Sequence, residues 1–282
     1  MRRLFTEPGC VRLVSGVISR VPQGSPPSVV RCDDRTMLRV VVPRIGGWWP
    51  TANEAATTRS IRLVRGDLAQ WQADALAVSA NPYLEGTSRA SHWRFAGRQN
   101  ADGSVRQAGG AALASSSSEA AARAGVPLAP GRAITSRAGG VLRADWVVHV
   151  VAPDALLEQP PERSALLRQT YDAALDAAAA KGCRSLALPA IGCGIRGFPP
   201  EEAAKAAFDA AAAWLTFQDG DRRHGQLSRV DFVVYSDFVA HHWWPCALSS
   251  FGTALEHAAL LDDALAVDLA PGGLVWRYRC GA

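Results

Sequence analysis

The sequence predicts a layered α/β fold built around a mostly parallel sheet. From Ile61 onwards, short apolar runs alternate with longer helical stretches, an order typical of this fold class. Some of the runs are almost continuously apolar, which indicates central strands that are covered on both faces. These runs are Trp146 to Val151, Ser185 to Pro189 and Arg229 to Tyr235. Because ligands bind beyond the carboxyl ends of the strands in such sheets, we expect the functional residues there.

The expected elements follow one another along the chain in a regular order. Apolar runs predict further strands at Ile61 to Arg65, Ala75 to Ala80 and Arg132 to Ser136. The stretches between the strands predict helices at Ser104 to Ala124, Glu162 to Lys181 and Glu201 to Phe217. The last of these helices follows a pair of prolines, which are favourable in a first helical turn.

Composition divides the chain into a central region and two extensions. In residues 1–60, proline and glycine interrupt short β-branched runs such as Leu38 to Val42, which predicts a strand or hairpin and a loop. That extension is expected to pack on the core or to belong partly to a transit peptide. Residues 61–240 carry the α/β pattern, and the pattern weakens in residues 241–282. There we expect a helix at Thr253 to Ala266 and a short apolar end at Leu274 to Trp276.

The overall composition is that of a soluble globular protein, with 48% apolar and 20% charged positions among 282 residues. The 30 basic and 26 acidic side chains leave a net charge of +4, which is too small to indicate a nucleic-acid partner. No run approaches the roughly 18 apolar residues of a membrane span, so we expect no membrane protein. We take the chain to be a monomer.

The cysteines and histidines give no sign of a metal site. The six cysteines are dispersed and form no Cys-x-x-Cys pair, so we expect a reduced intracellular compartment, the cytoplasm or nucleus. Met1-Arg2-Arg3 begins a stretch poor in acids, and an organelle transit peptide is the alternative. His241 and His242 are adjacent and cannot share a helical face, and His149 is expected to be a core histidine. We therefore expect no metal and no cofactor.

A glycine-rich loop from Pro189 to Pro199 follows one of the buried strands. Gly192, Gly194 and Gly197 leave the backbone bare just before a helix begins, so the loop amides can face an anion. The alternative is a tight turn from strand to helix without a ligand. The loop lacks the Gly-x-Gly-x-x-Gly spacing and the lysine of a P-loop, which disfavours ordinary dinucleotide and nucleoside-triphosphate sites.

Several ordered segments together resemble the macro domains, a family that binds ADP-ribose and in many members hydrolyses its conjugates. The segments are Gly66-Asp67, Asp74 to Asn81, Ala101 to Val105 with Ala108-Gly109, Gly131 to Thr135, His149 to Pro153 and the glycine-rich loop. They span about residues 61–240, and their common order is more specific than any one of them. The resemblance implies a three-layer α/β/α macro-type fold with a mixed, mostly parallel central sheet and decorated N- and C-terminal extensions.

The resemblance also assigns roles to single residues. It implies that Asp67 accepts a hydrogen bond from the adenine amine, although an aspartate there is also a suitable helix N-cap. Asn81 matches an asparagine that bonds a hydroxyl of the distal ribose, and its alternative is a structural role in the turn. The family's preceding asparagine is Val78 here. Phe238 stands where many members place an aromatic side chain against adenine, or else it only packs.

Asp102 is the residue on which catalysis is expected to depend, together with Asn81. In hydrolytic members an aspartate at the start of this helix activates or orients water near the anomeric carbon. The alternative is a carboxylate that only caps the helix. The other residues that the resemblance places against the ligand are Leu68, Gly97, Arg98, Asn100, Ala101, Gly103, Val105, Ala152, Gly192, Cys193, Gly194, Ile195 and Arg196.

Two departures from the family pattern affect the expected pocket. Asn81 and Asp102 are 21 positions apart (102 − 81), so roughly 11 residues, about Glu85 to Ala96, form an insertion that is either a lid or an outer loop. The family's run of glycines is reduced to Gly97, and Arg98 could supply charge to a phosphate instead.

The glycine-rich loop departs from the family at Cys193 and Arg196. Cys193 stands near a helix start, where a lowered pKa could make it a nucleophile, but a small buried cysteine that replaces threonine is the plainer interpretation. Arg196 replaces an aromatic residue and could pair with a terminal phosphate.

The resemblance thus implies a metal-independent hydrolase that releases ADP-ribose from an ester or phosphate at the distal ribose. Its substrate would be O-acetyl-ADP-ribose, a protein mono-ADP-ribosylated on acidic residues, or an ADP-ribose phosphate. One alternative is a non-catalytic module that reads ADP-ribose on proteins or free in solution. Another is a phosphoesterase for ADP-ribose 1″-phosphate or a cyclic phosphate from RNA processing.

Overall fold

The computed structural model describes residues 36–42, 59–86, 100–216, 226–260, 264–270 and 273–279. All of them lie within one unit of the chain, Cys32–Ala282. Most of the insertion expected at Glu85 to Ala96, together with Gly97 and Arg98, lies outside the described residues. Within the described part, no helix combines the length and the apolar content needed to cross a membrane.

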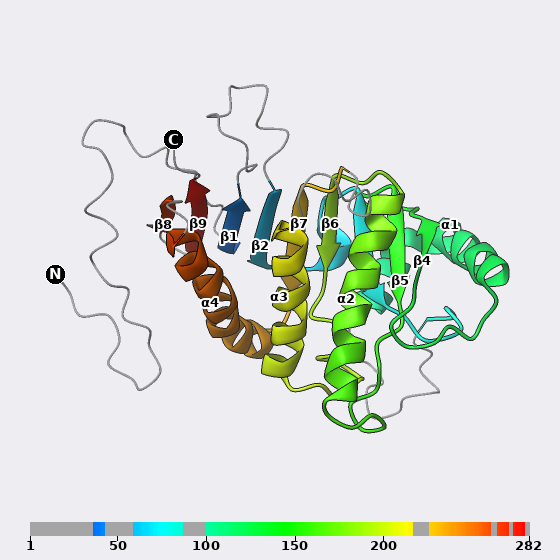
Figure 1. Cartoon of the computed structure of the whole chain (residues 1–282). Coiled ribbons are helices and arrows are strands. Elements are labelled where there is room, and N and C mark those ends of the chain that lie inside the picture. Colours follow the sequence, from blue (N-terminus) through cyan, green and yellow to red (C-terminus); the bar gives the residue numbers. More distant parts are fainter. Residues whose placement is uncertain are drawn as a thin grey trace. The chain divides into compact units, whose positions relative to one another are not determined.

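One mixed sheet with the strand order β4-β5-β3-β6-β7-β2-β1-β9-β8 organises the structure (Figure 1). Its strands are β1 (Thr36–Val42), β2 (Arg59–Arg65), β3 (Ala75–Ser79), β4 (Ala133–Arg137), β5 (Trp146–Val150), β6 (Ser185–Leu188), β7 (Arg229–Val234), β8 (Ala264–Ala270) and β9 (Gly273–Arg279). From β5 to β2 all neighbouring strands are parallel. The strands β4, β1 and β8 pair antiparallel with β5, β2 and β9, respectively, and β9 is parallel to β1.

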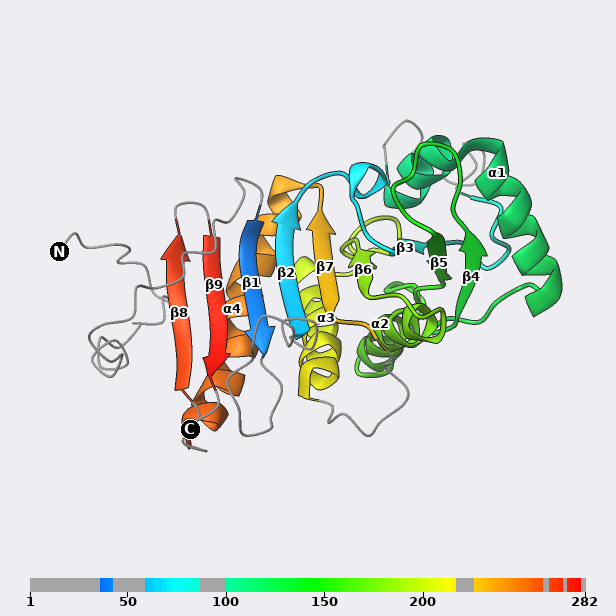
Figure 2. The ribbon, with the colours of Figure 1, turned by 90° about the horizontal axis from the view of Figure 1, so that it is seen from above.

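Helices cover both faces of this sheet. The helices are α1 (Ala101–Ala124), α2 (Glu162–Ala180), α3 (Pro200–Thr216) and α4 (Asp237–Leu260), with a short 3-10 helix, η3 (Leu68–Gln70). Figure 2 shows α1 on one side of the sheet and α2, α3 and α4 on the other. This is the three-layer α/β/α arrangement that the sequence predicts.

Two separate cores lie between the three layers, because successive residues of a strand point to opposite faces. On β5, Val148 and Val150 belong to the core that α2, α3 and α4 cover. Val147 precedes Val148 and points to the other face of the sheet, where it packs with Val105 and Leu113 of α1. The expectation of central strands covered on both faces is therefore confirmed.

The C-terminal extension differs from the sequence-based expectation. The helix predicted at Thr253 to Ala266 instead begins at Asp237 and ends at Leu260, and Ala264 already belongs to β8. Its start was missed because Pro245 and the polar histidines obscure the apolar face. Trp243 carries that face, with its ring centroid 5.3 Å from Phe208 and 5.7 Å from Phe232. The short apolar end predicted at Leu274 to Trp276 forms β9, which pairs with β1 and β8.

Candidate functional site

The carboxyl ends of the parallel strands bring most of the predicted site residues to one edge of the sheet. Asp67 follows β2, Asn81 follows β3, Ala152 follows β5, the loop 189–199 follows β6, and Phe238 follows β7. Because these strands are parallel and neighbouring, their loops emerge at the same edge. This is the edge where α/β sheets bind ligands.

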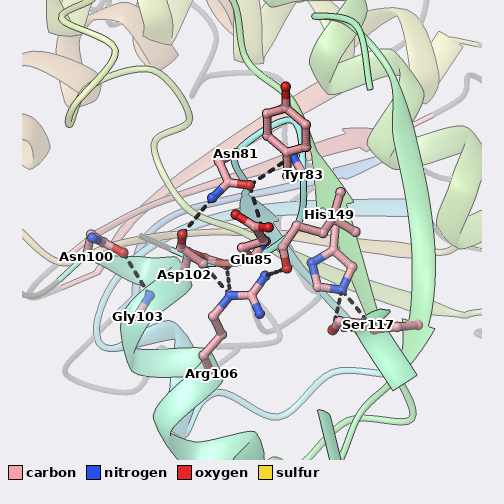
Figure 3. A network of polar contacts seen from close by, with 12 residues as sticks. Asn81, Tyr83, Glu85, Asn100, Asp102, Gly103, Arg106, Ser117 and His149 are labelled. Carbon is pink, nitrogen blue, oxygen red and sulfur yellow. Dashed lines mark hydrogen bonds and ion pairs between the residues drawn. The ribbon is translucent and has the colours of Figure 1, made fainter. Parts of the chain in front are cut away.

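Asp102 lies in the first turn of α1 but does not cap the helix. Asn100 has the extended N-cap conformation, and its side-chain oxygen accepts the N–H of Gly103 at 2.8 Å. The carboxyl of Asp102 is only 3% exposed, and Nε of Arg106 donates to both of its oxygens at 3.1 Å (Figure 3). Asn100 therefore provides the side-chain N-cap of α1, and the catalytic role of Asp102 stays a prediction.

Asn81 uses its side-chain amide within its own turn. Its Nδ2 donates to the carbonyl of Gly86 at 2.6 Å, and its Oδ1 accepts the N–H groups of Tyr83 and Glu85 at 3.0 and 3.2 Å (Figure 3). These contacts are those of a structural turn asparagine. A contact between Asn81 and a ribose stays a prediction.

Arg106 is the residue of this site that sequence reasoning missed. Besides contacting Asp102, its Nη2 donates to the carbonyl of Leu84 at 2.7 Å, so it joins α1 to the turn after β3. The signal in the sequence that could have indicated the ion pair of Arg106 with Asp102 is their spacing of four residues on a helix.

The loop 189–199 folds into turns that leave several amides unused. The N–H of Phe198 donates to the carbonyl of Gly192 at 3.1 Å, and the N–H of Gly197 to that of Gly194 at 3.1 Å. Gly192 has a φ of +93°, and a Cβ there would stand 3.0 Å from the Phe198 ring. The amides of Gly192, Gly194, Ile195 and Arg196 donate to no other described residue. Unpaired amides of this kind can hold the oxygens of a diphosphate.

The surroundings of Cys193 and Arg196 bear on the roles expected for them. Burial is the main reason that the pKa of the Cys193 thiol rises to about 12, so the thiol is protonated at neutral pH and the nucleophile interpretation is disfavoured. Nη1 of Arg196 lies 3.8 Å from a carboxylate oxygen of Asp154. A pairing of Arg196 with a phosphate stays a prediction.

The two residues expected at adenine differ in their surroundings. Asp67 caps η3, since its side chain accepts the N–H of Ala69 at 3.0 Å, and it also lines a groove of about 660 Å³ with Ser104 of α1. Phe238, in the first turn of α4, is 62% exposed, and its ring centroid lies 4.4 Å from that of His242. The packing alternative for Phe238 is therefore disfavoured.

Three further residues that the resemblance placed against the ligand, Leu68, Val105 and Ala152, are buried in the cores. Their contact with a ligand stays a prediction. Ala101 and Gly103 lie in the first turn of α1, beside Asp102.

The sequence predicts a core histidine with satisfied hydrogen bonds at position 149, and the structure confirms its burial but satisfies only one ring nitrogen among the described residues. Its Nε2 lies 2.8 Å from the hydroxyl of Ser136 and 3.3 Å from that of Ser117. Burial, and then the positive charge of Arg106, lower its pKa to about 3. Nδ1 has no hydrogen-bond partner among the described residues. In the same part of the chain no group of histidine, cysteine and carboxylate side chains could hold a metal ion.

Comparison with known proteins places this site in a family. The family model described as "Macro domain" matches residues 88–207. A macro domain-containing protein from Vibrio parahaemolyticus is 34% identical over 148 residues, which cover 52% of this chain and 79% of that protein. An O-acetyl-ADP-ribose deacetylase from Cronobacter sakazakii is 34% identical over 177 residues, which cover 63% of this chain and 87% of that protein.

Solved structures support the same fold. A macrodomain from Oceanobacillus iheyensis, solved with ADP, has a TM-score of 0.56 and 24% identity, and the match covers 71% of this chain and 93% of that one. A macrodomain from Trypanosoma brucei in complex with ADP-ribose has a TM-score of 0.52 and 23% identity, covering 66% of this chain and 68% of that one. The sequence segments, the three-layer fold and these likenesses agree: the chain belongs to the macro domain family.

Proposed function

We propose that this chain is a metal-independent hydrolase that binds ADP-ribose and releases it from an ester or phosphate at the distal ribose. One observation carries the proposal: a buried carboxylate, Asp102, lies at the ligand-binding edge of the sheet in the first turn of α1, a helix that is capped by the side chain of Asn100. We take an ester at the distal ribose as the leading substrate because several relatives are named O-acetyl-ADP-ribose deacetylases.

In this proposal the ligand lies along the carboxyl edge of the sheet. The unpaired amides of the loop 189–199 hold the diphosphate, and the exposed ring of Phe238 stacks against adenine. Asp67 has a second carboxylate oxygen besides the one that caps η3, and that oxygen accepts the adenine amine. The distal ribose then lies toward Asn81 and Asp102.

Asp102 orients or deprotonates the water that attacks at the distal ribose. A carboxylate fixed in a buried place is suited to this role, because its orientation needs no rearrangement during the reaction. For Asn81 to bond a ribose hydroxyl, its amide must exchange one of its present turn contacts.

A chromatographic turnover assay tests this function. O-acetyl-ADP-ribose, ADP-ribose 1″-phosphate and a protein mono-ADP-ribosylated on glutamate are offered to the wild type and to Asp102→Asn. We expect the substitution to lower kcat by about 10² to 10⁴ and to leave the Kd for ADP-ribose within about threefold.

Asp172→Asn is the matched control, because Asp172 also pairs with an arginine four positions away on a helix, Arg168 of α2. It should retain full turnover. If Asp102→Asn is as active as the wild type, Asp102 has no part in the mechanism.

A non-catalytic reader of ADP-ribose is the second candidate. It is favoured by the use of the Asn81 amide within its own turn and by Val78 in place of the family's first asparagine. Both features weaken the distal-ribose site and leave the adenine and diphosphate contacts untouched. Calorimetric binding of ADP-ribose without turnover of any of the substrates would establish the reader.

A further inference from the structure

The side chain of Arg106 contacts both Asp102 and the turn after β3. Its Nε lies 3.1 Å from each carboxylate oxygen of Asp102, and its Nη2 lies 2.7 Å from the carbonyl oxygen of Leu84. The side chain is 19% exposed, and its carboxylate partner is 3% exposed. Figure 3 shows its guanidinium between Asp102 and the Asn81 turn.

The turn from Asn81 to Gly86 is shaped to receive this guanidinium. Leu84 has a φ of +60°, an uncommon conformation for a residue with a side chain, and its buried side chain anchors the turn in the core. Gly86 has a φ of +82°, and a Cβ there would stand 2.9 Å from both Cδ and Nε of Arg106. The turn therefore closes over Arg106 because position 86 has no side chain.

The chemistry of the pair requires an arginine. A buried carboxylate needs a charged or hydrogen-bonding partner, and removing that partner leaves a costly unpaired charge. A guanidinium offers its donors in a rigid plane, so it can hold Asp102 with one nitrogen and Leu84 with another. A lysine supplies the same charge, but its single ammonium group has no second donor nitrogen held in a fixed plane.

We propose that Arg106 is a positioning residue, which holds the Asp102 carboxylate and the Asn81 turn in one fixed geometry. Its effect on catalysis rests on the proposed hydrolase function. A reacting group displaced by about 1 Å can lower a rate by about 10²-fold, so loss of Arg106 lowers kcat although it touches no substrate.

The test compares Arg106→Ala, Arg106→Lys and a control, Arg123→Ala, whose exposed arginine lies in the last turn of the same helix. For each variant kcat, KM, the Kd for ADP-ribose and the amide hydrogen exchange of Tyr83 and Glu85 are measured. Those two amides report on the turn, because both donate to Asn81 Oδ1.

Positioning predicts a kcat lower by about 10- to 100-fold in Arg106→Ala, with the Kd for ADP-ribose within about threefold of the wild type. The Tyr83 and Glu85 amides exchange about tenfold faster. Arg106→Lys, which keeps the charge and is less disruptive to folding, falls between the wild type and Arg106→Ala. Arg123→Ala matches the wild type in every measurement.

Two results would overturn the inference. Either Arg106→Ala and Arg106→Lys keep the wild-type kcat, or they lose ADP-ribose affinity at unchanged kcat, which would make Arg106 a ligand-binding residue. A wild type without turnover refutes the hydrolase proposal instead, and the exchange data alone then decide the geometric claim. Unchanged hydrogen exchange of the Tyr83 and Glu85 amides in Arg106→Ala would overturn the claim that Arg106 holds the turn, and faster exchange would support that claim.

Discussion

At the scale of single residues, Asn100 and Asp102 lie two positions apart and have different roles. Asn100 caps α1, while Asp102 faces Arg106. A residue without a capping role can be changed without loss of the helix start. Asp102→Asn is therefore expected to fold with α1 intact, so its kinetic effect reports on chemistry.

Cys193 is expected to be unreactive in the folded protein. Because burial raises the pKa of its thiol to about 12, almost no thiolate is present at pH 8. Iodoacetamide at pH 8 should leave Cys193 unlabelled in the native chain and label it fully in urea, as mass spectrometry of the peptide would show. Cys193→Ala should keep turnover within about twofold. Rapid native labelling would revive the nucleophile interpretation.

Sequence alone could place Asp102 but not describe its surroundings. The segment from Ala101 to Val105 carries enough helix-start and family signal to locate the carboxylate. The contacts of Arg106 with Leu84 depend on how the turn after β3 folds back over α1, which no local pattern encodes. The turn contacts of Asn81 agree with the structural alternative that the sequence offered for this residue, and its contact with a ribose stays a prediction.

At the scale of elements, one charged cluster joins α2 to α3 at the carboxyl edge of the sheet. Nε and Nη2 of Arg163 donate to the two carboxylate oxygens of Glu202 at 2.9 and 2.6 Å, and the hydroxyl of Ser164 donates to the same carboxylate at 2.6 Å. Nη1 of Arg163 donates to the carbonyl of Ala155 at 3.1 Å. The cluster thus fixes both helix starts to the loop after β5.

The Glu202 contacts predict a pH-dependent stability. The hydrogen bond from Arg163 is the main reason that the pKa of Glu202 lies below its usual value. A lowered folded-state pKa stabilises the fold above the unfolded pKa of about 4.3, and this contribution disappears as the pH falls through the folded value. Glu202→Gln should therefore unfold more easily than the wild type at pH 7, by about 1 to 2 kcal/mol.

Urea unfolding of both proteins at pH 7 and pH 3 measures this difference. The gap between the two free energies of unfolding should narrow between pH 7 and pH 3, because the contribution of the carboxylate is lost as the pH falls toward its lowered folded-state pKa. An equal gap at both pH values would show that Glu202 stabilises the fold by packing rather than by its charge.

The strands and helices were predicted best where the apolar pattern of the sequence is local. The runs that predict β2, β5 and β7 are mostly apolar, and the observed bounds of these strands agree with the predicted bounds within a few residues. The helix α4 was placed too late because its apolar contacts, such as Trp243 against Phe208, come from a distant helix. A proline and two histidines inside it also resemble a break.

At the scale of the whole molecule, the parallel strands determine where the site lies. The sequence could predict a mostly parallel, doubly covered sheet, and hence its carboxyl edge as the place of function. It could not predict that β1, β9 and β8 extend the same sheet beyond β2, because strand pairing between distant segments has no local signature. It also missed Asp231, a fully buried carboxylate on β7 that Nε of Arg62 holds at 2.6 Å and Nε1 of Trp71 holds at 2.8 Å.

Release of ADP-ribose from O-acetyl-ADP-ribose, compared between the wild type and Asp102→Asn at equal concentration, tests the central claim most directly. The account predicts product from the wild type and a loss of about 10² to 10⁴ in kcat for the variant, with ADP-ribose binding retained by both. Equal release by the two proteins would contradict a catalytic role for Asp102. Binding without release by either would contradict the hydrolase and favour the reader.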